Sequence, residues 1–275
     1  MRIVVPIKQV PETSAVRMDE ASGTMIREGV EAIINPLDLY AIELAIRLRE
    51  QLWQDAQVAC EVVAISMGPP KAMTALREAI AMGCDTAVLL SDKAFAGSDT
   101  WATSYVLAAG IRKLAPVDMI ICGERATDGD TGQVGPGIAS FLDLPVASYL
   151  SKFEGLIHDD SRTIARVHRL VEDGYEVLDV QLPAVLTVVK EAADPRLPTL
   201  RGKQKARAAD VPTWTAADLD VQSDKLGLAG SPTRVVRIFR PTVARKCIKM
   251  QAADEQSTAE AADALVKFLG QRGLV

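Results

Sequence analysis

One segment of the sequence combines glycines, hydroxyl groups and charged side chains in a pattern that could bind an anion. It runs from Gly123 to Pro136, after an apolar run that predicts a strand and before a run with helical spacing. Glycines let backbone N–H groups approach an anion closely, and a helix N-terminus favours negative charge. The pattern is neither Walker A nor GxGxxG, so two interpretations stay open, a nucleotide site and a purely structural loop. Four glycines lie at this junction between strand and helix, namely Gly129, Gly132, Gly135 and Gly137.

Polar side chains in and near this segment add donors and acceptors. Thr131 offers a hydroxyl donor, whereas Asp128 and Asp130 would repel a phosphate. We therefore expect the two aspartates to cap the helix, to hold the loop or to bind ribose hydroxyls.

Two more segments place polar residues at predicted helix starts. In Asn35-Pro36-Leu37-Asp38, Asn35 can cap the helix with Pro36 in its first turn, and Asn35 or Asp38 could also face a ligand. The hydroxyls from Ser98 to Ser104 could bind a second phosphate or simply cap their helix.

Composition excludes several other chemistries. The chain has only two histidines, His158 and His168, so a His-rich metal site cannot be built. Its four cysteines contain no CxxC pair, which argues against a zinc site or a disulfide scaffold, and we expect Cys122 to be an inert core thiol. The net charge of −5 argues against bulk nucleic-acid binding. We predict no metal and no catalytic side chain.

The apolar runs are short. The longest uncharged ones, Thr100–Ile111 and Thr131–Leu142, have 12 residues, against about 20 for a membrane span. The first residues resemble a strand and not a signal peptide. We therefore expect a cytoplasmic protein without a membrane span.

Strand-like runs alternate with helix-like runs over the first 145 residues. This order predicts an α/β fold, an open and mostly parallel Rossmann-like sheet with helices on both faces. Ligands bind beyond the carboxyl ends of such strands, where the polar segments above fall. The predicted strands are Arg2–Ile7, Val58–Ser66, Thr86–Leu90 and Met119–Cys122, and the predicted helices are Pro36–Trp53, Ala72–Met82, Thr100–Leu114 and Thr131–Leu142.

The pattern changes after residue 145. Two alternating runs, Thr163–Val171 and Tyr175–Leu182, flank an Asp-Gly pair and predict a β-hairpin, which the strand Val185–Val189 follows. A basic, polar stretch, loops and a final helix over Thr258–Leu269 come next. We predict a nucleotide-binding domain over 1–190, a partner-recognition loop over 191–210 and an extended C-terminal arm with a helix over 211–275.

Several ordered motifs together resemble the β subunit of an electron transfer flavoprotein. They are Val4-Val5-Pro6-Ile7-Lys8-Gln9-Val10-Pro11, Asn35-Pro36-Leu37-Asp38, Ser66-Met67-Gly68-Pro69, Asp128 to Pro136, and Leu182-Pro183-Ala184-Val185. The resemblance implies a heterodimer with an α subunit that carries FAD in a mobile domain. It also implies an adenine nucleotide within the sheet of the β subunit.

The same resemblance implies which residues touch that nucleotide. Outside the glycine-containing segment they are Pro6, Asn35, Pro36, Leu37, Asp38 and Met67. Within it they are Gly123, Glu124, Arg125, Ala126, Thr127, Asp128, Gly129, Asp130, Thr131, Gly132, Gln133 and Val134.

The resemblance leaves the identity of the nucleotide open. Some family members hold AMP, and electron-bifurcating members hold a second FAD that takes a hydride from NADH. The glycine-containing segment and the helix start with Asp99, Thr100 and Thr103 resemble the bifurcating pattern, so we expect FAD, with AMP as the alternative. In either case the chain is an electron-carrier subunit, and it would oxidise NADH only within a bifurcating heterodimer.

Partner docking is implied for a further segment. Lys190–Leu200 matches the recognition loop that docks onto flavin dehydrogenases or a quinone oxidoreductase, with Ala192, Pro195 and Arg196 at matching positions. Ala192 departs from the leucine common there, which weakens any inference about an acyl-CoA dehydrogenase. A different class of function, a stand-alone nucleotide-binding sensor or transferase, stays open beside the carrier.

Overall fold

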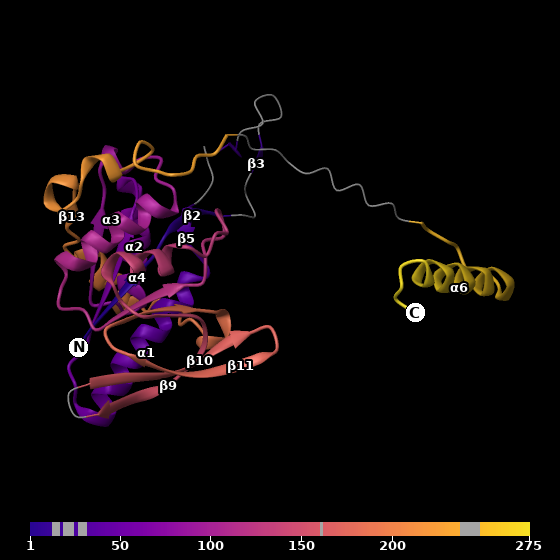
Figure 1. Ribbon diagram of the computed structural model, residues 1–275, viewed down its shortest axis with the longest axis horizontal. Coiled ribbons are helices and arrows are strands. Elements are labelled where there is room, and N and C mark those ends of the chain that lie inside the picture. The colour runs from indigo at the N-terminus through magenta and orange to yellow at the C-terminus, as the bar shows by residue number, and fades with distance from the viewer. Residues whose placement is uncertain (13–16, 19–24, 27–31, 160–161, 237–247) are drawn as a thin grey trace. The chain divides into compact units, whose positions relative to one another are not determined.

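The computed structural model describes residues 1–12, 17–18, 25–26, 32–159, 162–236 and 248–275 (Figure 1). Their contacts divide the chain into two units, Met1–Val236 and Arg237–Val275. No helix among the described residues is long and apolar enough to cross a membrane.

A nine-stranded sheet forms the centre of the first unit. Its order is β11-β10-β9-β12-β8-β1-β6-β7-β13, and the seven strands from β9 to β13 in that order run parallel (Figure 1). They are β9 (Val146–Asp159), β12 (Ala184–Val188), β8 (Met119–Gly123), β1 (Arg2–Pro6), β6 (Glu61–Met67), β7 (Thr86–Leu90) and β13 (Thr213–Trp214). The predicted open, mostly parallel sheet is confirmed.

The predicted hairpin is confirmed at one end of this sheet. β10 (Arg162–Val171) pairs antiparallel with β9 and with β11 (Gly174–Gln181). Gly174 has φ +142°, a conformation that a residue with a Cβ rarely adopts, so the Asp-Gly turn depends on it. Two small two-stranded sheets complete the strands of the described chain, β2 (Gln9–Pro11) with β5 (Ala32–Ile34) and β3 (Arg17–Met18) with β4 (Met25–Ile26).

Helices cover both faces of the sheet, because successive strand residues point to opposite sides. On β1, Ile3 and Val5 belong to one buried apolar cluster and Val4 to another. The first cluster includes α1 (Asp38–Ala56) and α2 (Met73–Met82), and the second includes α3 (Thr100–Lys113) and α4 (Val134–Leu142). Short 3-10 turns, η2 (Pro70–Ala72) among them, lie in the connections.

Three features differ from the sequence-based expectation. The sequence did not predict β9, because buried and exposed positions do not alternate regularly along its 14 residues. This strand pairs parallel with β12 and antiparallel with β10. α4 begins at Val134 and not at residue 131, since Asp130 (φ +53°) and Gly132 (φ +64°) have left-handed backbone conformations.

The third difference is α5 (Leu200–Ala208), a helix within the basic stretch expected to be irregular. Only Ala206 of this helix is buried, so the sequence shows no apolar stripe. The helix lies against α2, where a Cβ at Gly202 would meet the Ala81 carbonyl oxygen at 2.1 Å. A backbone contact through glycine, and not a run of large apolar residues, lets α5 approach so closely.

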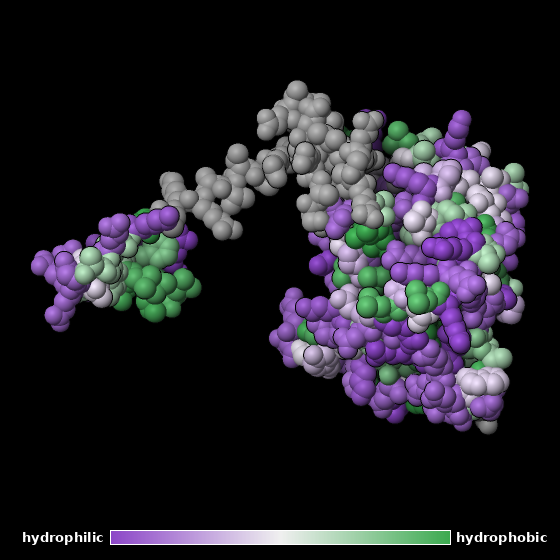
Figure 2. Space-filling view, turned by 180° about the vertical axis from the view of Figure 1, so that it is seen from behind, coloured by the Kyte–Doolittle hydropathy of each residue, from purple (hydrophilic) through white to green (hydrophobic). Residues whose placement is uncertain are grey.

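The second unit contains α6 (Glu255–Gly270), which agrees with the predicted final helix. An Asp254–Ser257 capping box starts it. Leu265, Val266 and Phe268 are exposed on it, and Figure 2 shows apolar side chains gathered along one side of this helix.

A cluster of ion pairs links the segment that follows β12 to α1. The Arg196 guanidinium donates to both Glu43 oxygens (2.8 and 3.1 Å) and both Glu50 oxygens (2.6 and 2.9 Å). Burial alone would raise the pKa of Glu43, but hydrogen bonds from Arg196 and Arg47 outweigh it and hold that pKa below its usual value. The hydrogen bond from Arg196 also lowers the pKa of Glu50.

We expect Arg196→Met to lower the free energy of unfolding by about 2 kcal/mol at pH 7, because buried Glu43 would keep only Arg47 and the backbone N–H of residue 196 as partners. The lowered pKa values of Glu43 and Glu50 mean that their carboxylates stabilise the folded state at pH values above the ordinary pKa of 4.5. This stabilisation is lost as the pH falls through the lowered pKa values. The gap between wild type and variant should therefore shrink below about pH 4.5, as measured by urea unfolding at several pH values.

Arg166→Met is the matched control. Arg166 also makes a two-oxygen pair, with Asp179, but both side chains are exposed. Exposed pairs contribute little, so the control should stay near wild type. A gap that is equal at pH 7 and pH 3.5, or equal in both variants, would contradict this account of the cluster.

Candidate functional site

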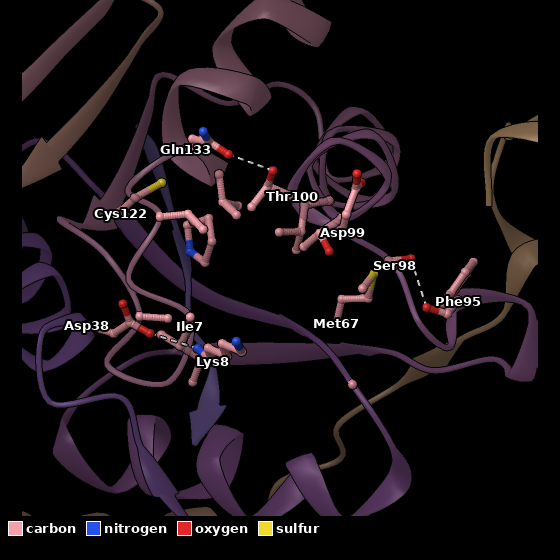
Figure 3. Close-up of a pocket in the computed structure, with 18 of the residues that line it drawn as sticks. Ile7, Lys8, Asp38, Met67, Phe95, Ser98, Asp99, Thr100, Cys122 and Gln133 are labelled. Atoms are coloured by element: carbon pink, nitrogen blue, oxygen red, sulfur yellow. Dashed lines mark hydrogen bonds between the residues drawn. The ribbon is translucent and has the colours of Figure 1, made fainter. Parts of the chain in front are cut away.

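A pocket of about 840 Å³ opens beyond the carboxyl ends of four parallel strands, β1, β8, β6 and β7 (Figure 3). The loops that follow these strands form its walls, as the sheet topology requires. Of the predicted contacts, those that line it are Pro6, Asp38, Met67, Asp99, Thr100, Thr103, Gly123, Glu124, Arg125, Ala126, Gly129, Thr131, Gly132, Gln133 and Val134.

The remaining predicted contacts lie outside this lining. Asn35, Pro36, Leu37, Thr127, Asp128 and Asp130 are not among the residues that face the pocket. Asn35 is fully buried. The Leu37 backbone packs closely against the end of β8, since a Cβ at Gly123 would lie 2.9 Å from the Leu37 carbonyl oxygen. These two residues support the pocket wall.

The glycines of the segment divide into two roles. Gly129 and Gly132 line the pocket, and no described side chain or backbone atom outside the adjacent residues lies within 3.5 Å of where their Cβ would be. Gly135, which also lines the pocket, and Gly137 serve close packing, because a Cβ there would meet Thr187 Cγ2 at 2.5 Å and Ser104 Oγ at 2.4 Å. Two of the four glycines thus leave open space at the pocket, and two let neighbouring elements approach closely.

The two helices that begin at the pocket differ at their N-termini. α3 is capped by Asp99, whose Oδ1 accepts from the Trp101 and Ala102 N–H groups at 3.0 and 3.1 Å. α4 starts after Gln133 with no side-chain cap among the described residues. Capping therefore accounts for Asp99, whereas the N–H groups at the start of α4 remain available to an anion.

Asp38 and Asn35 link three segments at the pocket, which are the residues after β1, the start of α1 and the loop after β8. Asp38 accepts the Lys8 N–H at 2.7 Å and the Asn35 Nδ2–H at 2.9 Å. Asn35 also donates to the Arg125 carbonyl (2.9 Å) and accepts the Thr127 N–H (3.1 Å). The expected capping of α1 by Asn35 is wrong, since α1 has no side-chain cap bond and the Asn35 side chain turns to the 125–127 loop instead.

The chemistry of Asp38 follows from its burial. Removal from water raises the pKa of this carboxyl to about 7, although hydrogen bonds from Asn35 and from the Lys8 N–H oppose the rise. Figure 3 shows Asp38 and Lys8 together at one side of the pocket. The pocket therefore contains a buried carboxyl that exchanges a proton near neutral pH.

Two cationic side chains at the pocket, Lys8 and Arg125, pair with carboxylates of the loop that follows β8. Lys8 Nζ lies 2.6 Å from Asp128 Oδ1, and Arg125 pairs with Glu124 (2.9 Å) and Asp130 (2.7 Å). Of the three roles considered for the two aspartates, these contacts correspond to holding the loop. Sequence reasoning did not select Lys8, although its place directly after β1 was a usable signal.

Sequence reasoning also missed the wall between β7 and α3. Phe95 is buried in the 3-10 turn η3 (Lys93–Phe95) and lines the pocket together with Gly97 and Ser98. The sequence indicates only the hydroxyl groups near residue 100 as possible ligand contacts or caps in this loop. Its apolar contribution has no periodic pattern that could have revealed it.

Thiols and metals are not prominent at the site. Cys122 lies at the pocket, and burial raises the pKa of its thiol, which fits the expected inert thiol. Within the described part of the chain, no group of three or more His, Cys, Asp or Glu side chains could hold a metal ion.

The three predicted partner-recognition residues lie outside the pocket lining. Ala192 ends the 3-10 turn η4 (Lys190–Ala192) and packs against the core, Pro195 is half-buried, and Arg196 is occupied by Glu43 and Glu50 on α1. The exposed apolar side chains of this region are instead Leu197 and Leu200, with exposed fractions of 86% and 87%.

Comparisons with known proteins show the family of this chain. Residues 22–219 match the model of the electron transfer flavoprotein domain family. The chain is 48% identical over 241 residues to the caffeyl-CoA reductase–Etf complex subunit CarD of Acetobacterium woodii, covering 88% of both chains. It is 48% identical over 246 residues to the electron transfer flavoprotein subunit beta of Thermoanaerobacterium thermosaccharolyticum, covering 89% of this chain and 90% of the relative.

A third relative spans nearly the whole chain. The electron transfer flavoprotein subunit beta of Megasphaera elsdenii is 39% identical over 278 residues, with 99% of both chains covered. Identity of this extent over the strands, the glycine-containing segment and the regions after β12 places this chain in the electron transfer flavoprotein family as a β subunit.

Proposed function

We propose that this β subunit binds FAD in the pocket at the carboxyl ends of β1, β6, β7 and β8 and takes part in electron bifurcation. It would do so as a heterodimer with an α subunit that carries a further FAD. The observation that carries the proposal is the combination of a large pocket with an uncapped helix N-terminus and two open glycines at its wall.

The residues present fit a dinucleotide. The N–H groups at the start of α4, the open backbone at Gly129 and Gly132 and the Thr131 hydroxyl would hold phosphate oxygens, and Lys8 would add a positive charge. When bound, FAD supplies hydride acceptance and the release of single electrons, while the protein supplies position and electrostatics.

The extent of the pocket favours FAD over AMP. Its lining continues from Gln133 past Met67 to Phe95 and Ser98 (Figure 3). About 840 Å³ lies near the upper end of the range for ligand sites. AMP is only the adenylate half of FAD and would leave much of this lining without contacts. AMP stays the alternative, in which the nucleotide is structural.

We propose a flavin dehydrogenase as the redox partner, with a quinone oxidoreductase as the alternative and NADH as the reductant. One relative is named as a subunit of a caffeyl-CoA reductase–Etf complex, and another, from Anaerotignum propionicum, as an acryloyl-CoA reductase electron transfer subunit. Both names support a dehydrogenase that acts on a CoA ester. The exposed Leu197 and Leu200 support the proposed recognition loop as a docking surface.

The domain limits stay part of the proposal. We assign nucleotide binding to 1–190, partner recognition to 191–210 and contact with the α subunit to 211–275. The apolar side of α6 supports the last assignment, since exposed apolar side chains indicate an interaction site. The cytoplasmic location stays a prediction from the sequence.

Ligand analysis of the purified αβ complex tests the proposal directly. We expect two FAD per heterodimer and no AMP, measured by mass spectrometry and flavin absorbance after denaturation. One FAD with one AMP would contradict the bifurcating proposal and support the alternative. A chain that purifies alone, without a flavoprotein partner, would favour the stand-alone sensor or transferase.

Gly129→Val tests the position of the site. The side chain enters open space at the pocket wall, so we expect an unchanged fold and about tenfold or more weaker nucleotide binding. Nucleotide content after gel filtration and the melting temperature of the nucleotide-free complex are the measurements.

Gly155→Val is its matched control, because Gly155 is also open and lies on β9, away from the pocket lining. The control should keep wild-type nucleotide content. Unchanged occupancy in Gly129→Val, or equal loss in both variants, would show that the site is misplaced.

Removal of residues 237–275 tests the assignment of the last segment. These residues form a unit of their own, so we expect the first unit to keep its fold and its melting temperature. Association with the α subunit should weaken, as measured by size-exclusion chromatography over a concentration series. A truncated chain that forms the heterodimer as tightly as wild type would contradict the assignment.

A further inference from the structure

The chain returns to the pocket wall in a segment that carries no nucleotide motif. We call residues 226–233 the strap. Leu226 is buried, the Leu228 N–H donates to the Ala96 carbonyl at 3.0 Å, and a Cβ at Gly227 would meet the Ala94 carbonyl oxygen at 2.4 Å. The strap therefore lies directly against the loop between β7 and α3 that lines the pocket.

The strap ends on the residue that caps α3. The Thr233 N–H and hydroxyl both donate to Asp99 Oδ2 at 2.8 Å, and the Asp99 N–H donates to Ser231 Oγ at 2.8 Å. Asp99 Oδ1 meanwhile accepts from the first turn of α3. One carboxylate thus joins two segments that are 134 residues apart in the chain.

These contacts lower the pKa of Asp99. Burial alone would raise its pKa, but hydrogen bonds from the Ala102 N–H and from Thr233 outweigh burial and hold the pKa below its usual value. A carboxylate accepts such bonds more strongly than a neutral acid. Loss of the Thr233 donors would therefore weaken the cap as well as the strap.

Asp99 is connected in turn to the open N-terminus of α4. The hydroxyl of its neighbour Thr100 donates to Gln133 Oε1 at 2.8 Å, and Gln133 directly precedes α4. Asp99, Thr100 and Gln133 all line the pocket. A chain of contacts thus runs from the strap through Asp99 and Thr100 to Gln133, beside the direct packing of α3 on α4, where Ser104 Oγ lies 3.3 Å from the Val134 carbonyl oxygen.

We propose that Ser231 and Thr233 are positioning residues of the nucleotide pocket. Through Asp99 and Thr100 they hold the starts of α3 and α4 at the separation that retains the nucleotide, although neither residue lines the pocket. The strap lies within the segment assigned to contact with the α subunit, so a partner bound to that segment would act on Asp99 through Thr233. This inference rests on the proposed function, namely that an adenine nucleotide occupies this pocket.

Thr233→Val, alone and with Ser231→Ala, tests the inference in the full-length αβ complex. The control is Thr215→Val, because the Thr215 N–H and hydroxyl also both donate to one aspartate oxygen, that of Asp218, in the turn η5 (Ala216–Asp218). Mass spectrometry first identifies the nucleotide in wild type as FAD or AMP, and release of that compound is then followed by timed gel filtration. Hydrogen exchange at the Trp101 and Ala102 amides of the nucleotide-free complex is the second readout.

We expect roughly threefold to tenfold faster release from the strap variants and faster exchange at both amides, since the net contribution of a typical hydrogen bond is on that scale. Thr215→Val should match wild type in both readouts. Equal release from Thr233→Val, Thr215→Val and wild type, with the nucleotide present in wild type, would overturn the inference and leave the proposed function standing. Parallel losses in Thr233→Val and Thr215→Val would also overturn it, because they would indicate general destabilisation. A wild-type complex without adenine nucleotide would overturn the proposed function and the inference with it.

Discussion

The buried carboxylate of Asp38 is the interaction on which the pocket depends. It lies at the start of α1, under the ends of β1 and β8, and accepts hydrogen bonds from the Lys8 N–H and from Asn35. A Cβ at Gly123 would come within 2.3 Å of its Oδ1, so β8 can end there only with glycine. Burying a carboxylate costs free energy unless its oxygens are satisfied, and the same bonds that satisfy them also align the walls of the pocket.

The arrangement explains why neighbouring residues of one motif have different tasks. Asn35 is buried, and its side chain makes two hydrogen bonds to the backbone of the 125–127 loop, whereas Asp38 faces the pocket. Gly129 and Gly132 leave space at the wall, whereas Gly135 lets α4 approach Thr187 on β12. A motif that is continuous in sequence is therefore divided in space between ligand-facing and supporting positions.

The two helix starts show how local chemistry and distant contacts combine. Asp99 caps α3 as its position before the helix predicts, yet its second oxygen is bound by the strap. Among the described residues, α4 has no side-chain cap, and two open glycines, Gly129 and Gly132, precede it. Two helix starts that look alike in the sequence therefore differ in whether a side chain binds their first N–H groups.

The sequence alone determined the alternation of strands and helices, because apolar periodicity is a local property, and Thr86–Leu90 was predicted with its observed ends. It also determined the hairpin turn at Gly174 and the segments that meet at the carboxyl ends of the strands. The resemblance to a family supplied the predicted nucleotide contacts, most of which line one pocket. Only the tertiary structure decided which glycines face that pocket, why the basic stretch forms α5 and how Thr233 reaches Asp99. Those outcomes depend on contacts between residues far apart in the chain, and no local spacing of residue types encodes which distant backbone will lie against them.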